Sequence, residues 1–391
     1  MYRGPLKLSV AVVLVLFLSV ISTLSYGQNG WPLDPIDQGH PIGNSFGEFQ
    51  DDGGCVRDGF PLPSCAYQHA GIDILGTPRW SDSQCQIEDP SAPWVRATVG
   101  GNAEVHYIEN DFNVYNYISI EDANSVIYRY GHIEWRSLLA TISIDADNNA
   151  IVQEGSPMAQ LARWFSCDYH HLHYEIEKGG EFINPLKSII PHPDTDLPEI
   201  TAVSFVRNNS DEQLKQLDST GCIVVSGEVD IIAQVSERDR AGSDHPGTKT
   251  LWVHRVRWRA CPESNPNCSW NDTYSFDTMP TEWHDTKNNA ATLAYFSVID
   301  PWKSNSDYCK KTDLYAIVTN SKSDANGMPR PDQAGSWDTR TIPDGNYYVS
   351  VEAKDFAGNT NLPMTPICVH VNNGVSSNGV PPSSPKGLRI R

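Results

Sequence analysis

The stretch Asp168-Tyr-His-His-Leu-His-Tyr-Glu-Ile-Glu177 alternates in character from one position to the next. Such a period of two is typical of a half-buried β-strand. On a strand, His171 and His173 point to the same face, about 6.7 Å apart. Two imidazoles placed in this way can serve one site, where one holds a metal and the other handles protons. His170 points to the opposite face, so we expect it to have a structural role.

Two upstream segments carry residues that can complete such a site, namely His69-Ala-Gly-Ile-Asp73 and Tyr130-Gly-His132-Ile133. Four residues of extended strand span about 13 Å, whereas the ligand atoms of zinc lie about 2 Å from the ion. His69 and Asp73 can therefore share a metal only if the chain bends between them. Gly71 permits such a bend, and a straight strand would exclude the pair.

His69, Asp73 and one histidine of the 171/173 pair make a set of three ligands, two imidazoles and one carboxylate. Three protein ligands leave a fourth position for water, which is typical of a catalytic rather than a structural zinc site. No HExxH helix motif supplies a glutamate base here. His132 and the remaining histidine of the pair are therefore the candidates for moving protons and stabilising an oxyanion.

From about residue 43 to 187 the chain resembles the M23 peptidases, the lysostaphin- and LytM-like zinc endopeptidases of cell walls. The resemblance is carried by short motifs in the family's order: Ser45-Phe-Gly47, His69-Ala-Gly-Ile-Asp73, Gly76-Thr-Pro78, Tyr130-Gly-His132-Ile133, Gly155-Ser-Pro157 and His171-Leu-His-Tyr-Glu-Ile176. It implies His69, Asp73 and His173 as ligands of Zn²⁺ and His132 and His171 as the catalytic pair. It also implies a small antiparallel sheet with the site in a groove.

Two Cys-bearing loops, at about 51–65 and 79–93, are longer than in that family. They should reshape the walls of the groove. The loops therefore bear on which substrate the resemblance implies, and not on the chemistry that it implies. Trp31, Trp80 and Trp164 are candidates for lining the groove, although packing in the core or in loops is the favoured interpretation. His40, His106 and His192 have no partners in the pattern and are expected to be structural.

The chain as a whole predicts a mostly β fold, because short runs of Val, Ile, Tyr and Thr are broken by Gly, Pro, Asn and Asp. We expect an antiparallel-sheet peptidase domain of the M23 type at 43–190, a linker at 191–198, a β-sandwich module at 199–372 and a flexible tail at 373–391. The segment from Asp344 to Asn359 resembles a strand and turn of immunoglobulin-like or fibronectin-III-like modules.

Several runs are expected to be strands. In the first domain they are Val95–Val105 (two strands around a Gly turn), the pair Tyr115–Ile120 and Ser125–Tyr130, and a strand after Gly155-Ser-Pro157. In the second they are Ile200–Phe205, Cys222–Val235, Leu251–Arg259, Ala294–Val298, Asp313–Val318 and Tyr347–Ala353.

Residues 1–27 read as a signal peptide, with Arg3 and Lys7 before an apolar run from Leu8 to Leu24. An extended leader follows at 28–42. The alternative is an uncleaved membrane anchor, since the run is about long enough for a thin span. Either way, the sequence predicts a secreted, periplasmic or cell-envelope protein. Nine cysteines in an exported chain indicate disulfides rather than zinc ligands, with an unknown connectivity and at least one thiol left over.

The formal net charge of −19 makes nucleic acid a poor partner, because phosphate would be repelled. The expected function is hydrolysis of a peptide bond in peptidoglycan stem peptides or cross-bridges by an exported zinc endopeptidase. Three alternatives stay open: a secreted protease that acts on Gly-rich proteins, a non-catalytic wall-binding or adhesive protein with a relic site, and an amidase that cuts the sugar–peptide link. The sequence does not determine the oligomeric state or the role of the second module.

Overall fold

The computed structural model describes residues 30–51, 56–57, 60–61, 66–76, 92–109, 114–162, 170–208, 212–238, 251–281, 314–319 and 335–374. The predicted signal peptide, the strand expected at Ala294–Val298, most of the tail and most of the two Cys-bearing loops lie outside these residues. Within them the protein is mostly β, as the sequence predicts. The domain boundaries stay a prediction.

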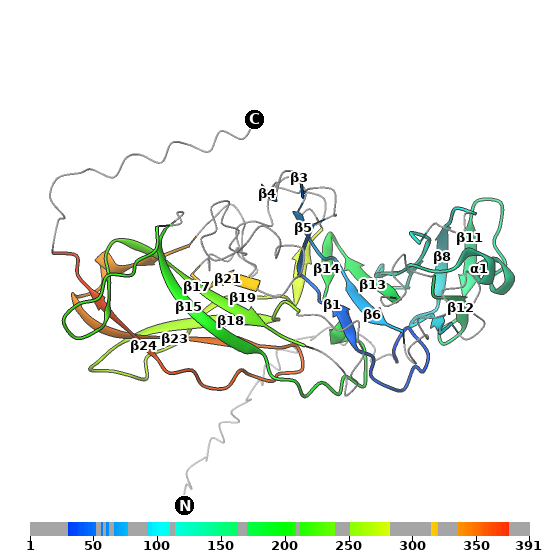
Figure 1. Ribbon diagram of the computed structural model, residues 1–391. Coiled ribbons are helices and arrows are strands. Elements are labelled where there is room, and N and C mark those ends of the chain that lie inside the picture. The colour runs from blue at the N-terminus through cyan, green and yellow to red at the C-terminus, as the bar shows by residue number, and fades with distance from the viewer. Residues whose placement is uncertain are drawn as a thin grey trace, which may run out of the picture.

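A nine-stranded antiparallel sheet holds the first half of the chain together (Figure 1). Its strands run in the order β1-β6-β13-β10-β9-β8-β11, and β14 and β20 continue it from β13. Their bounds are β1 Ile42–Asn44, β6 Ile72–Leu75, β8 Gly101–His106, β9 Tyr117–Glu121, β10 Ile127–Gly131, β11 Asn149–Val152, β13 His171–Lys178, β14 Glu181–Ile183 and β20 Thr278–Pro280.

Alternation along the central strands separates the two faces of this sheet. On β13, Leu172, Tyr174 and Ile176 are buried on the face opposite the histidines. The hydroxyl of Tyr174 lies 2.8 Å from Oγ1 of Thr98, and the hydroxyl of Tyr130 on β10 lies 2.6 Å from the same atom. Burial raises the pKa of Tyr130 to about 12, so both rings are neutral parts of the core. The apolar face thus holds β10 and β13 rigidly in register beneath the polar face.

The predicted pair of strands at 115–120 and 125–130 is confirmed by β9 and β10, which pair directly. The two strands predicted around the Gly turn at 100 are also present, as β7 (Trp94–Arg96) and β8, but they belong to different sheets. β7 pairs with β12 (Pro157–Gln160), the strand predicted after Gly155-Ser-Pro157. The remaining short pairs are β2 Phe49–Asp51 with β5 Ala66–Gln68, and β3 Val56–Arg57 with β4 Phe60–Pro61.

One short helix, α1 (Trp135–Thr141), was not predicted. The carboxylate of Glu134 caps it by accepting hydrogen bonds from the backbone N–H groups of Arg136 and Ser137. Only Leu138 among its residues is buried, so two turns leave too little periodicity for recognition in the sequence. A single 3₁₀ turn, η3 (Pro185–Lys187), follows β14.

The second half forms two further sheets that pack face to face (Figure 1). One contains β15 Glu199–Arg207, β17 Glu228–Ser236, β21 Leu314–Ile317 and β22 Trp337–Asp338. The other contains β16 Ile223–Val225, β24 Ile367–Val371, β23 Gly345–Lys354, β18 Arg255–Pro262 and β19 Asn271–Ser275, with β16 parallel to β24. Most expected strands are present where the structure describes them, but the one expected at Cys222–Val235 is two strands, β16 and β17, because the chain turns at Gly227 with a φ of +75° and enters the other sheet. The strand expected at Leu251–Arg259 begins only at Arg255. The immunoglobulin-like or fibronectin-III-like resemblance stays a prediction.

The core between these two sheets is aromatic. Trp258 of β18 faces Trp337 of β22 with ring centroids 6.1 Å apart, and Trp337 meets Tyr347 of β23 edge to face at the same distance. Two disulfides reinforce the second sheet, Cys222–Cys368 and Cys261–Cys268. The expectation of disulfides is confirmed for these four cysteines and fits an oxidising compartment. The other five cysteines lie outside the described residues.

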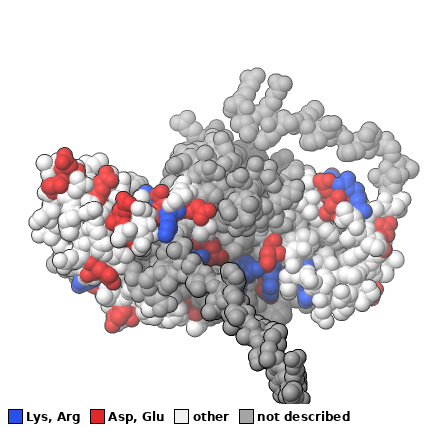
Figure 2. Space-filling model, turned by 180° about the vertical axis from the view of Figure 1, so that it is seen from behind, with Lys and Arg blue, Asp and Glu red and all other residues white. Residues whose placement is uncertain are grey.

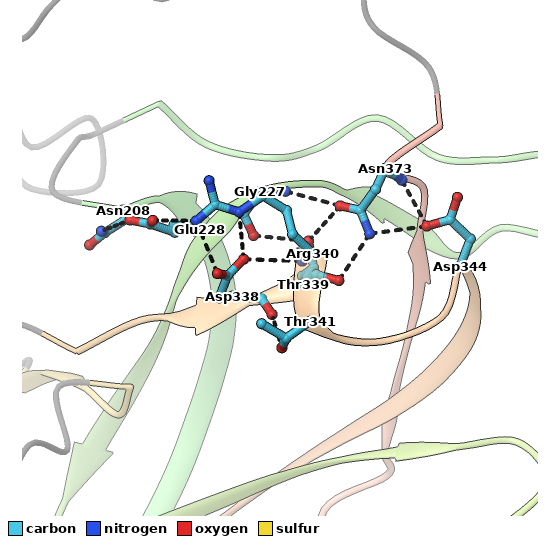
Figure 3. A network of polar contacts seen from close by, with 9 residues as sticks. All are labelled: Asn208, Gly227, Glu228, Asp338, Thr339, Arg340, Thr341, Asp344 and Asn373. Carbon is cyan, nitrogen blue, oxygen red and sulfur yellow. Dashed lines mark hydrogen bonds and ion pairs between the residues drawn. The ribbon is translucent and has the colours of Figure 1, made fainter.

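A polar network closes the end of the sandwich (Figure 3). Arg340, in the 3₁₀ turn η6 (Thr339–Thr341), binds Asp338 and Glu228 through its guanidinium group. Asn373 joins the 3₁₀ turn to the loop before β23, because its side chain donates to the carbonyl of Thr339 and to Asp344. The network ties residues just after β24 to both sheets.

The two halves are joined by more than the linker. β20 of the second half pairs with β14 and so extends the sheet of the first half. Asn184 donates to the carbonyl of Phe276 at 3.0 Å, and Lys187 binds Asp277 at 3.0 Å. One buried apolar cluster runs through both halves. The second half is therefore packed against the first.

Acidic side chains are scattered over the described part of the face seen in Figure 2, with fewer Lys and Arg among them. This distribution matches the dispersed negative charge of the sequence. Among the described residues, which begin at position 30, no helix is long and apolar enough to cross a membrane.

The ion pair at the junction predicts a pH dependence. The contact of His254 with Asp277, aided by Ser275 and Lys187, outweighs partial burial and holds the pKa of Asp277 well below its usual range. A lowered carboxyl pKa stabilises the fold above the unfolded value of about 3.9, and this stabilisation is lost as the pH falls further. As the pH falls from about 5 to about 2, the melting temperature of Asp277→Asn should therefore decrease less steeply than that of the wild type.

The effect should be small, because Asp277 is 45% exposed and solvent screens the pair. Asp147→Asn, which removes an exposed carboxylate from a turn, should follow the wild-type slope. Parallel pH profiles for all three proteins, measured by calorimetry, would contradict the proposed contribution of this junction.

Candidate metal centre

Four neighbouring strands align the centre of the site in one row across the sheet. Asn44 of β1 lies opposite Asp73 of β6, Asp73 lies opposite His173 of β13, and His173 lies opposite Gly131 of β10. Directly opposed side chains on antiparallel strands have Cβ atoms about 4.5–5.5 Å apart, so this register alone brings Asp73 and His173 together. Gly131 leaves room beside the ring, because a Cβ at this position would lie 3.3 Å from Cβ of His173.

His69 reaches the row from the loop before β6. Its backbone is held by the 45–48 loop: the N–H of Gly47 donates to the carbonyl of His69, and the N–H of His69 donates to the carbonyl of Glu48. The resulting bend brings Nε2 of His69 to 3.2 Å from Oδ1 of Asp73. The bend that a shared metal required is therefore present.

Gly71 is needed in this bend for a different reason from the one expected. Its φ is not in the positive range. A Cβ on Gly71 would instead lie 2.3 Å from the carbonyl oxygen of Tyr174 on β13. Glycine therefore permits close approach of two backbones rather than a special turn.

The three predicted metal ligands form a compact triangle. Nδ1 of His173 lies 2.9 Å from Nε2 of His69 and 3.0 Å from Oδ1 of Asp73, and the third side is the 3.2 Å contact already described. A tetrahedral zinc ion with bonds of about 2.0–2.2 Å holds its ligand atoms roughly 3.2–3.6 Å apart. The triangle is close to that size, and its two imidazoles and one carboxylate are donors that zinc prefers.

Outer hydrogen bonds set the tautomers of the rings. A carbonyl oxygen can only accept, so Nδ1 of His69 donates to Ser45 at 3.1 Å and Nδ1 of His132 donates to Val114 at 2.7 Å. Nε2 of His173 donates to Oε1 of Glu175 at 2.7 Å. In the neutral ring of His69 the other nitrogen, Nε2, then carries the lone pair and faces Asp73. Nδ1 of His173 also faces Asp73 and is the atom that can hold either a proton or a metal.

The charges at the centre are strongly coupled. Burial would raise the pKa of Asp73, but the charges of His171 and His69 and a hydrogen bond from His173 hold it well below its usual value. Burial would lower the pKa of His173, but hydrogen bonds to Asp73 and Glu175 outweigh it and raise the pKa to about 10. In the metal-free chain, a proton on His173 therefore occupies the position that a cation would take.

The two predicted catalytic histidines lie beside this triangle. The rings of His132 and His171 meet edge to face with centroids 4.6 Å apart, and the ring of His132 lies 5.8 Å from that of His173. Nε2 of His171 is 3.5 Å from Oδ2 of Asp73. Burial, together with the charges of His171 and His173, lowers the pKa of His132 well below its usual value, so this ring is neutral at pH 7.

His132 also adopts a backbone conformation with φ of +62°. Positive φ is uncommon for residues other than glycine, and strained conformations of this kind cluster at functional sites. The structure thus brings all five sequence-predicted site residues into one cluster. Their individual roles stay predictions.

Two residues of the site were not recognised in the sequence. Glu175 holds His173 from behind, and Asn44 donates from Nδ2 to Oδ2 of Asp73. Period-two alternation could have found Glu175, because it lies two positions after His173 on the same face. No local signal marks Asn44, whose place depends on the pairing of β1 with β6.

The structure also tests the roles expected of two residues outside the cluster, Trp31 and His40. Trp31 is buried in the core and donates from Nε1 to the carbonyl of Pro191, so it does not line a groove. His40 is fully buried and lies beside Trp31. Trp80 and Trp164 lie outside the described residues, and the groove implied by the resemblance stays a prediction.

Comparisons with known proteins find only weak similarity. No family model matches the chain, and no curated protein matches it. Solved structures similar to it include M23 peptidase domains. A mutant catalytic domain of the prophage-encoded M23 protein EnpA from Enterococcus faecalis is 20% identical, with a TM-score of 0.21, and covers 30% of this chain and 76% of its own.

Two other solved structures are similar to the same degree. The SpoIIQ–SpoIIIAH pore-forming complex is 16% identical, with a TM-score of 0.26, over 42% of this chain and 92% of the matched one. A protein assigned as the glycyl-glycine endopeptidase LytM from Ruminococcus gnavus is 16% identical, with a TM-score of 0.20, over 30% of this chain and 44% of its own. Scores this low do not support a functional assignment.

The hydrogen bond from Nε2 of His173 to Glu175 predicts an effect on zinc affinity. Glu175→Gln keeps a hydrogen-bond acceptor for Nε2 of His173 but removes the charge, so zinc should bind about 10–100-fold more weakly. Glu175 and Glu177 both bind Arg129, at 3.3 and 2.6 Å. Glu177→Gln is therefore the matched control, because Glu177 contacts none of the predicted metal ligands among the described residues. Competition with a zinc chelator measures both affinities. Equal affinities in the two variants would contradict the role of Glu175.

Because the backbone of β13 lies so close to Gly71, we predict that a side chain at this position lowers both the stability of the fold and the binding of zinc. Gly71→Ala forces Cβ against the backbone of β13, and overpacking of this kind typically costs about 1–3 kcal/mol. The variant should melt at lower temperature and bind less zinc per chain. Gly374→Ala places its Cβ in ordinary contact, 3.5 Å from Asp344, and should do neither. Normal zinc content in Gly71→Ala would show that the bend tolerates a side chain.

Proposed function

We propose that this chain is an exported zinc endopeptidase that hydrolyses peptide bonds in peptidoglycan stem peptides or cross-bridges. The observation that carries the proposal is the triangle of His69, Asp73 and His173 with two further histidines at its edge. Three protein ligands leave one position open, which distinguishes a catalytic from a structural zinc site.

The donor set fits zinc, because two imidazole nitrogens and one carboxylate oxygen converge, and the proton that His173 holds in the metal-free chain is the one that zinc would displace. When bound, zinc supplies a Lewis acid that polarises a carbonyl group and lowers the pKa of water. Glu175 keeps the ring of His173 oriented, and Asn44 keeps the carboxylate of Asp73 oriented. These residues hold the site in place before any ligand arrives.

The neighbouring histidines provide the remaining chemistry. His132 is neutral, and its Nδ1 proton is engaged by Val114, so Nε2 can accept a proton from an attacking water. An N–H of His171, whose ring touches that of His132, can donate to the carbonyl oxygen as it gains negative charge. The proton held on His132 can then pass to the departing amine.

The substrate class rests on the sequence motifs and on the compartment. The order of motifs from Ser45 to Ile176 resembles enzymes that cut cell walls. The disulfides fit an exported protein, which could reach such a substrate. A Gly-rich protein would present the same peptide bond, so the substrate has to be decided by experiment.

Two substitutions separate binding of the metal from catalysis. His173→Ala should lose zinc. His132→Ala should keep zinc but lose about 10²–10⁴-fold in kcat, because it removes a proton acceptor and no ligand. His106→Ala, at a partly exposed histidine paired with Glu104, should change neither quantity. Full zinc content together with full activity in either of the first two variants would refute the assignment.

Fragments released from purified peptidoglycan test the reaction itself. We expect mass spectrometry to show new amino and carboxyl ends within stem peptides or cross-bridges, and His132→Ala to release none. Cleavage of the link between sugar and peptide would identify an amidase instead. Cleavage of an elastin-like protein but not of cell wall would identify a protease of Gly-rich proteins, and zinc binding without any cleavage would identify a relic site.

A further inference from the structure

A second cluster of metal-ligating groups lies away from the histidines. Asp194 of the linker, Glu237 directly after β17 and Asp355 directly after β23 each offer a carboxylate oxygen, and these atoms lie within 4.8 Å of one another. The three residues are 7%, 7% and 1% exposed. Burying several carboxylates together is costly unless a positive charge or shared protons compensate them.

The backbone around the cluster is organised. Oδ1 of Asp355 accepts hydrogen bonds from the N–H groups of Gly358 and Asn359, both at 2.7 Å. The side chain of Asn359 in turn donates to the carbonyls of Asp194 and Asp196, at 3.2 and 3.3 Å. The turn after β23 therefore holds the linker against the sandwich.

One carboxylate oxygen of the cluster takes part in none of these hydrogen bonds. Oδ2 of Asp355 is buried and has no hydrogen-bond partner among the described residues. Burial raises the pKa of Asp355, and the charge of His192 is among the effects that oppose this rise. The ring of His192 packs at 6.2 Å from that of Phe356. A buried carboxylate oxygen without a partner marks a place where something binds, since leaving it unsatisfied costs free energy.

We propose that Asp194, Glu237 and Asp355 form a binding site for a hard divalent cation, and specifically for Ca²⁺. All three ligand atoms are carboxylate oxygens, with neither the imidazole nor the thiolate that would favour zinc. Calcium binds oxygen at about 2.3–2.6 Å, so two of its ligands lie at most roughly 5.2 Å apart. The separation within this cluster is inside that limit.

One of the three ligands, Glu237, borders a groove. Glu237 and Asp196 line a groove of about 710 Å³, together with Ile200, Gln234 and Asn361. Calcium takes six to eight oxygen ligands, and water from this groove can complete the shell around the three carboxylates. The groove also gives the ion a path to a cluster that is otherwise buried.

Bound calcium would couple the linker to the sandwich. Asp194 belongs to the segment that joins the two halves, whereas Glu237 and Asp355 end strands on opposite sheets of the sandwich. One cation binding all three would hold the linker against both sheets and would compensate the charge of the three carboxylates. This site is independent of the proposed peptidase activity.

Calorimetry on the full chain, loaded with one equivalent of zinc, tests the proposal with CaCl₂ as the probe. We expect the wild type to bind one Ca²⁺ per chain and its melting temperature to rise with calcium. Asp355→Asn keeps the acceptor for the two amides but removes the charge, and should bind Ca²⁺ at least tenfold more weakly. Glu237→Gln should do the same. Asp145→Asn, in an exposed turn where Oδ1 likewise accepts two amides, should bind as the wild type does.

A measurement on the wild type alone covers the case in which the variants fail to fold. Calcium should slow hydrogen exchange at residues 192–197 and 355–359. Wild-type protein that neither binds millimolar Ca²⁺ nor changes in exchange would overturn the proposal. Unchanged affinity in Asp355→Asn would also overturn it. Greater stability of Asp355→Asn in EGTA, with a wild type indifferent to calcium, would show that shared protons compensate the cluster instead.

Discussion

The pairing of β6 with β13 is the interaction on which the rest of the structure depends. It places Asp73 directly opposite His173, so that a carboxylate and an imidazole meet without any adjustment of the chain. A shift of one residue would turn every side chain of either strand to the other face. The buried residues Leu172, Tyr174 and Ile176 prevent such a shift, because they would be moved into the polar face. The apolar side of the sheet therefore keeps the polar side in register.

The second half of the chain supports this arrangement from outside the sheet. Oγ of Ser45 donates to the carbonyl of Trp252, while the carbonyl of Ser45 accepts from His69. Phe276 occupies the space beside Gly47, where a Cβ would lie 2.2 Å from its ring. The loop that orients His69, a candidate metal ligand, thus rests on residues more than 200 positions away. A spacer would not need these contacts, so the sandwich has a structural part in the candidate metal centre.

The two clusters of potential ligands differ in the chemistry that they support. At the first, imidazoles alternate with the carboxylates of Asp73 and Glu175, and His173 holds a proton between these two carboxylates before a cation binds. At the second, three carboxylates gather at the junction of linker and sandwich. Soft or borderline nitrogen ligands suit zinc, whereas oxygen alone suits calcium. One chain can therefore discriminate between the two ions by ligand type.

The sequence by itself determined the mostly β character, most of the strands and the five side chains of the candidate centre. Alternation of period two and short motifs are local, and they can be read without knowing which strands pair. It did not reveal the helix α1, whose two turns are too short to show a period, or the roles of Asn44 and Glu175. Only the tertiary structure decided that β7 and β8 belong to different sheets, that β20 extends the sheet of the first half, and that Asp194, Glu237 and Asp355 meet. Such contacts join positions far apart in the chain, and their geometry depends on the register and packing of whole sheets rather than on any neighbouring residues.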